Sequence, residues 1–176
     1  MMLELPKVQA HMEGVPEVEQ EAALNVLPTK GLALLPDAVL AERVRIQADF
    51  LKTLEPEPCK SYLDGTLPGK DAVRYREKLS PAQRARWREI KFLAVELPLT
   101  ESAQRAEPTE EAVGQAYLAC IAALPKEDSE RLAAGLPTMP QALAPEACWL
   151  GIKLHEAILL APPEPQAIMA RKLFNP

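Results

Sequence analysis

Eighteen prolines punctuate this chain of 176 residues, and their positions constrain the fold more than any other feature. Most of them fall between apolar segments and not within them. Proline lacks an amide proton and restricts the residue before it, so it ends one helix or begins the next. The intervening segments are rich in Ala and Leu and comparatively poor in β-branched residues and glycine, which favours helix over strand. We therefore expect short helices separated by proline-containing turns.

Apolar periodicity and capping residues place these helices along the chain. Ser80, Pro81 and Gln83 form a helix start with a capping box, and Asp37 is expected to cap the first long helix. The pattern predicts long helices over 37–54, 81–97, 109–124 and 145–161, and shorter ones over 17–27, 59–63, 71–79, 126–134 and 164–174.

The expected fold class is all-α, a compact array of about seven or eight short, mostly antiparallel helices. We expect one all-helical domain over 17–176, preceded by an extended or flexible arm over 1–16. Residues 113–136 align with 150–173, so the C-terminal half can be interpreted as two similar helical hairpins. Chance similarity between hairpins of equal length is the simpler explanation of that match.

Composition excludes several classes of protein. With 48% hydrophobic and 26% charged residues, the chain has the composition of a globular protein and not of a disordered one. A net charge of −5 argues against a nucleic-acid-binding protein, which needs positive charge to neutralise phosphates. No apolar run reaches the roughly 20 residues of a membrane-spanning helix. Membrane contact would therefore require a segment that is absent from this chain.

No cofactor, metal or catalytic motif is complete in this sequence. His155 and Glu156 begin a zinc-protease pattern, but Leu159 stands where the second histidine would be needed. The segment 65–70 has three residues between its glycines instead of the four of a phosphate-binding loop, and Asp71 replaces the hydroxyl residue. We therefore expect neither a bound cofactor nor a catalytic site.

Three cysteines occur, and two of them stand near expected helix ends. Cys59 follows Pro58 and Cys148 precedes Trp149, so two backbone segments could meet there and form a disulfide. Such a bridge would join the middle of the chain to the C-terminal hairpins and would indicate an oxidising compartment. The alternative is three reduced thiols in a cytoplasmic protein. Cys120 lies on an apolar helical face and is expected to be buried.

The segment 70–91 concentrates positive charge. It contains eight Lys or Arg and three acids, so it carries a charge of +5 while the remainder carries −10. Arg84, Arg88 and Lys91 share one helical face, and Tyr75 lies nearby in the sequence. These four residues are the predicted partner-binding site, suited to a protein with an acidic surface. The alternative is a solvated helix face balanced by the acidic remainder of the same chain.

The leading hypothesis is a non-enzymatic helical protein-interaction domain of bacterial origin, acting as a scaffold, adaptor or inhibitor. One alternative is an extracytoplasmic domain of an envelope or secretion-associated protein, which would be periplasmic if its N-terminus has been trimmed. Another is an enzyme whose acid and base come from distant helices and leave no motif. The oligomeric state is left open by the sequence.

Overall fold

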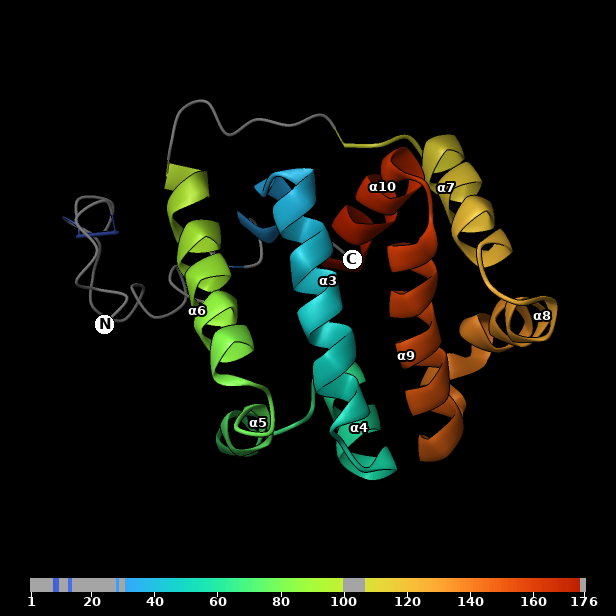
Figure 1. Ribbon diagram of the computed structural model, residues 1–176, viewed down its shortest axis with the longest axis horizontal. Helices are drawn as coiled ribbons and strands as arrows, with labels where there is room; N and C mark the ends of the chain where they lie inside the picture. The colour runs from blue at the N-terminus through green and yellow to red at the C-terminus, as the bar shows by residue number, and fades with distance from the viewer. Residues whose placement is uncertain (1–7, 10–12, 14–27, 29–30, 100–106, 175–176) are drawn as a thin grey trace.

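The computed structural model describes residues 8–9, 13, 28, 31–99 and 107–174. From residue 37 onward, this described part contains eight α-helices and two short 3-10 helices, and none of its residues is in a strand (Figure 1). The α-helices are α3 (Asp37–Lys52), α4 (Pro56–Leu63), α5 (Gly69–Arg76), α6 (Pro81–Glu96), α7 (Glu110–Ala122), α8 (Lys126–Gly135), α9 (Ala144–Leu160) and α10 (Pro163–Phe174). The 3-10 helices are η1 (Leu97–Leu99) and η2 (Leu136–Gln141). The predicted all-helical class is confirmed.

Two helices differ most from the expected boundaries: α5 spans Gly69–Arg76 and not 71–79, and α4 starts at Pro56 and not at Cys59. Pro56 and Pro58 both lie in its first turn, where the amides would have no helical partner and a proline therefore loses no hydrogen bond. The arm expected over 1–16 lies outside the described residues except for residues 8, 9 and 13. The helix expected over 17–27 lies outside them entirely.

The capping box at the start of α6 forms as predicted. The Ser80 side chain accepts a hydrogen bond of 3.2 Å from the Gln83 amide, and the Gln83 side chain accepts one of 3.0 Å from the Ser80 amide. The capping role expected for Asp37 is wrong. Pro36 takes the cap position without a side-chain hydrogen bond, and the Asp37 carboxylate, one residue inside the helix, pairs with Arg171 of α10.

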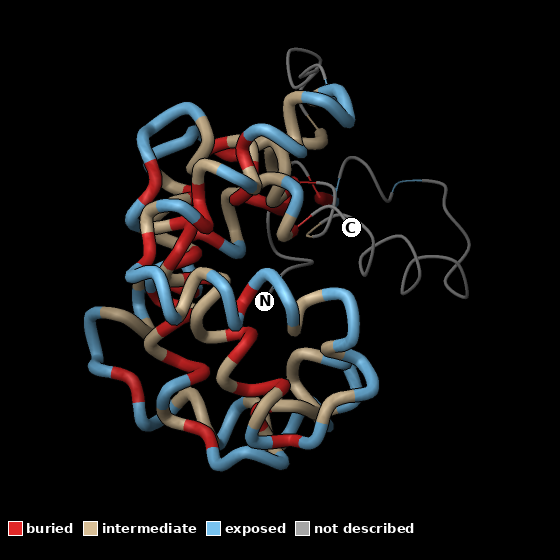
Figure 2. Tube along the Cα trace, turned by 90° about the vertical axis from the view of Figure 1, so that its right-hand side faces the viewer, coloured by how far each residue is buried: buried red, intermediate tan, exposed pale blue. Residues whose placement is uncertain are grey.

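The core lies around α3 and α9, which pack against each other. α3 also packs against α6 and α10, and α9 also contacts α4, α7, α8 and α10. Leu40 and Phe50 of α3 and Leu150 and Ile158 of α9 are completely buried. Buried and exposed stretches alternate along the long helices, as amphipathic helices around one core require (Figure 2).

The C-terminal half consists of two helix pairs, as the hairpin interpretation expected. α7 and α8 are joined around Pro125, α9 and α10 around Pro162, and α10 packs closely on α7. The Gln166 side chain donates hydrogen bonds of 3.1 Å to the carbonyls of Ile158 and Leu159, which close the last turn of α9. No helix among the described residues is long and apolar enough to cross a membrane.

The turn between α5 and α6 brings the predicted basic segment into one corner of the molecule. α5 lies across the lower end of α6 in Figure 1, and only four residues, 77–80, connect the two helices. The Lys78 amine donates a hydrogen bond of 2.9 Å to the Thr53 carbonyl at the end of α3. This hydrogen bond attaches the turn between α5 and α6 to the end of α3.

Candidate functional site

A cavity of about 410 Å³ opens between α5 and α6, and we call it the basic cleft. Four cations line it, Arg76 from α5 and Arg84, Arg88 and Lys91 from α6. The last three are the residues predicted from helical spacing, since their separations place them on one face of α6. Arg76 was missed because only the fold of α5 against α6 brings it to the same cavity.

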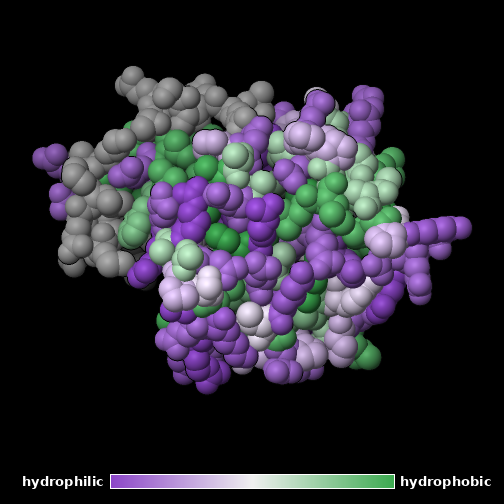
Figure 3. All heavy atoms as spheres, viewed as in Figure 1, coloured by the Kyte–Doolittle hydropathy of each residue, from purple (hydrophilic) through white to green (hydrophobic). Residues whose placement is uncertain are grey.

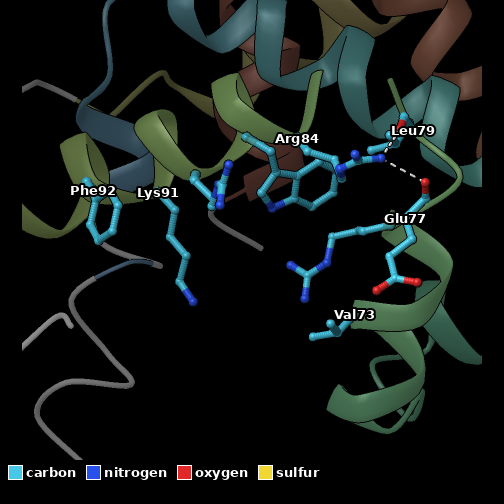
Figure 4. A pocket seen from close by; sticks show the side chains of 9 residues that line it. Val73, Glu77, Leu79, Arg84, Lys91 and Phe92 are labelled. Carbon is cyan, nitrogen blue, oxygen red and sulfur yellow. Dashed lines mark hydrogen bonds between the residues drawn. The ribbon is translucent and has the colours of Figure 1, made fainter. Parts of the chain in front are cut away.

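Apolar side chains form the rest of the cleft. Val73 and Leu79 come from α5 and the turn, and Trp87 and Phe92 come from α6. Trp87 is buried, with an exposed fraction of 7%, whereas Val73 is 53% exposed. In Figure 4, Lys91 extends from α6 into the open space, which Val73 faces from α5. The cleft therefore combines positive charge with an apolar surface.

Arg84 has a structural role within the cleft. Its guanidinium donates hydrogen bonds of 2.8 Å and 2.5 Å to the carbonyls of Glu77 and Leu79, as the dashed lines in Figure 4 show. These carbonyls follow the last turn of α5, so a cation there stabilises the helix end. Arg84 thus holds the turn between the helices, and Arg88 and Lys91 extend beyond it as exposed side chains.

The cations of the cleft have no acidic partner among the residues that the structure describes. Glu77 is the one carboxylate lining the cavity, and no described acid forms an ion pair with Arg76, Arg84, Arg88 or Lys91. Arg86, on another face of α6, differs because it pairs with both Glu42 and Glu89. Hydrophilic side chains gather over α5, at the lower end of the face in Figure 3. Within the described part of the chain, this positive charge is therefore not neutralised by an ion pair.

Tyr75 lies outside the cleft. It packs half-buried against the hydrophobic core, and it does not line the cavity. Its ring is contacted by Arg74 at 5.1 Å and Lys78 at 5.3 Å, both measured to the ring centroid. Proximity in sequence to the basic residues did not place it with them, because successive residues of a short helix point in different directions.

The structure pairs Cys59 with Cys148, the two cysteines singled out from the sequence. The pair joins the N-terminal halves of α4 and α9, with the two Cα atoms 5.5 Å apart, inside the usual range for a disulfide. Cys120 is free and buried, as expected, and burial raises the pKa of its thiol to about 11. Such a thiol is almost entirely protonated near neutral pH and is a poor nucleophile.

His155 is 1% exposed and lies in the core. Its Nδ1 lies 2.7 Å from the Gly151 carbonyl, so Nδ1 carries the proton and donates to that oxygen. Nε2 is buried and has no hydrogen-bond partner among the described residues. Burial lowers the pKa of His155 to about 4, so the ring is neutral at physiological pH.

A larger hollow, about 560 Å³, lies between the start of α3 and α10. Its cation Arg171 is paired with Asp37, which also lines it, and Glu164 adds a further negative charge. Because the positive charge there is already neutralised within the chain, we assign the candidate site to the basic cleft.

The described residues contain no group of three His, Cys, Asp or Glu side chains placed to hold a metal ion. Neither a family model, nor a curated protein, nor a solved structure matches this chain.

Proposed function

We propose that this chain is a non-enzymatic helical protein-interaction domain, a scaffold, adaptor or inhibitor, that binds an acidic segment of a partner protein in the basic cleft. The observation that carries this proposal is the set of four cations around an apolar surface, with no described carboxylate paired to them. Complementary charge increases the rate and specificity of association, and a buried apolar contact supplies affinity. The partner segment should therefore contain both acidic and large apolar residues.

The test is fluorescence anisotropy with a labelled short peptide in which Glu alternates with Leu. The double variant Arg88→Glu, Lys91→Glu reverses two cleft charges that make no hydrogen bond within the described structure. It should weaken binding by at least about tenfold, or about 1.4 kcal/mol. The matched control is Lys70→Glu, Lys172→Glu, which changes the net charge equally at exposed positions outside the cleft.

Two results would contradict the proposal. An equal loss in both double variants would mean that the peptide responds to net charge and not to the cleft. Equal binding of a peptide with Gln in place of every Glu would mean that charge complementarity has no role. Raising the salt concentration should also weaken wild-type binding, because the contacts lie at the surface.

A second candidate, an extracytoplasmic domain of an envelope or secretion-associated protein, is favoured by the pairing of Cys59 with Cys148. Disulfides persist in oxidising compartments and are rare in the cytoplasm. Protein taken from its native source should be unfolded in denaturant without reductant, so that the buried thiols become accessible, then alkylated and its mass measured by mass spectrometry. Modification of one thiol supports this candidate, and modification of all three opposes it.

A further inference from the structure

Three cations from three different helices come together beside the basic cleft. Arg43 of α3, Arg76 of α5 and Lys91 of α6 line a smaller cavity of about 210 Å³. This cavity shares Arg76, Trp87 and Lys91 with the basic cleft, so the two are neighbours around the Trp87 ring. No described carboxylate lines the smaller cavity.

The two guanidinium groups lie close to the same indole ring. The central carbon of Arg43 is 3.6 Å from the Trp87 ring centroid, and that of Arg76 is 5.7 Å from it. Cation–π contacts of this kind orient a guanidinium but do not neutralise its charge. Trp87 therefore holds two like charges near each other at one wall of the cavity.

The hydrogen-bonding capacity of these cations is only partly used. Nη1 of Arg43 is buried and has no hydrogen-bond partner in the described part of the chain. The Nε of Arg76 donates a hydrogen bond of 3.1 Å to the Ala72 carbonyl, a partner within its own helix. Neither arginine nor Lys91 forms an ion pair with a described acid. A buried donor without a partner destabilises the folded state, so an external acceptor would be bound favourably.

The pKa values are consistent with this crowding of positive charge. Partial burial, followed by the charges of Arg76 and Arg43, lowers the pKa of Lys91. Burial lowers the pKa of Arg43, while the neighbouring Tyr62 partly offsets that effect. An anion between these groups would oppose both the burial cost and the mutual repulsion.

We infer that Arg43, Arg76 and Lys91 form an oxyanion-binding site that holds a carboxylate group of the acidic partner. This inference rests on the proposed function, which identifies the oxyanion as a carboxylate. Guanidinium groups suit it because their planar N–H donors match the two oxygens of a carboxylate, and Lys91 adds a mobile charge at the rim. The apolar part of the basic cleft would then contact the residue next to that carboxylate.

The inference is tested by thermal unfolding of the intact, oxidised protein in sodium glutarate, compared with sodium chloride at equal ionic strength. Glutarate should raise the Tm in a saturable way beyond the chloride effect, because it binds only the folded site. Arg76→Gln and Lys91→Gln should each weaken the apparent glutarate affinity by about tenfold. Lys70→Gln, an exposed residue outside both cavities, is the control and should keep the wild-type response.

The same variants without glutarate separate an anion site from a structural role. Since Arg76 and Lys91 repel each other and have no described acidic partner, Arg76→Gln and Lys91→Gln should leave the Tm unchanged or raise it. A lower Tm in both would show that these charges stabilise the fold itself, which would overturn the inference. A Tm response to glutarate no greater than to chloride would overturn it as well. If inorganic phosphate raises the Tm and glutarate does not, the assignment of the bound group as a carboxylate is overturned.

Peptide binding distinguishes a failure of this inference from a failure of the proposed function. If the acidic peptide binds and Arg76→Gln leaves its affinity unchanged, the oxyanion site is wrong and the proposed function survives. If glutarate binds through Arg76 and Lys91 but the acidic peptide does not bind, the oxyanion site is confirmed as a site for small carboxylates. The protein-interaction proposal is then wrong.

Discussion

Reduction of the bond between Cys59 and Cys148 should lower the free energy of unfolding by several kcal/mol. The bond spans 89 positions of the sequence. For a loop of that length the chain-entropy relation predicts a loss of about 4.5 kcal/mol at 25 °C, because the reduced unfolded chain gains freedom. Both cysteines are buried and a reduced cysteine still packs as a small apolar residue, so the folded state should lose little. The corresponding decrease in Tm is about 9 to 18 °C for a chain of this size.

The measurement is urea unfolding followed by circular dichroism, with and without a phosphine reductant. The dependence of the unfolding free energy on urea should also steepen after reduction, since the unfolded chain exposes more surface. The double variant Cys59→Ala, Cys148→Ala should be insensitive to the reductant. Cys120→Ala should keep the full sensitivity. A difference below about 1 kcal/mol between oxidised and reduced protein would refute the argument that the long loop dominates the effect.

Four further predictions concern single residues. Because the pKa of His155 is lowered to about 4, the unfolded state gains its proton first as the pH falls. About 3 kcal/mol of stability should be lost between pH 6.5 and 4, and His155→Gln should flatten the dependence of the unfolding free energy on pH. Gly114→Ala should stabilise the protein by about 1 kcal/mol, since no atom lies near the added Cβ in mid-helix. By contrast, Gly31→Ala should destabilise it by at least about 2 kcal/mol, because that Cβ would fall 1.5 Å from the Ala94 carbonyl oxygen. Ser80→Ala should cost about 1 kcal/mol through loss of the capping box. Urea unfolding measures each change, and a Gly114→Ala variant less stable than wild type, or a Gly31→Ala variant equal to it, would contradict the packing described.

The helices could be predicted because their signals are local. The capping box of Ser80 and Gln83 involves residues only three positions apart, and proline acts on its own turn and the residue before it. The cap expected at Asp37 was wrong because the partner of this side chain is distant in the sequence. Its carboxylate pairs with Arg171, which is 134 positions away, and no local pattern indicates such a partner.

The residues of the candidate site were likewise predictable from the sequence only where their grouping depends on local spacing. Arg84, Arg88 and Lys91 could be grouped from helical spacing alone, because an α-helix places such residues on one face whatever surrounds it. Their different roles could not, since Arg84 binds carbonyls at the end of α5 and the other two do not. Tyr75 was grouped with them by sequence proximity, and the fold places it outside the cleft.

The sequence by itself determined the all-helical class, most helix boundaries, the basic face of α6 and the two cysteines able to pair. Each depends on interactions within a few turns or on residue chemistry that context does not change. Only the tertiary structure decided that Arg43 and Arg76, from two other helices, share a cavity with Lys91 around Trp87. The packing of α3, α5 and α6 sets those distances, because apolar surface drives helices together without specifying which polar groups meet between them.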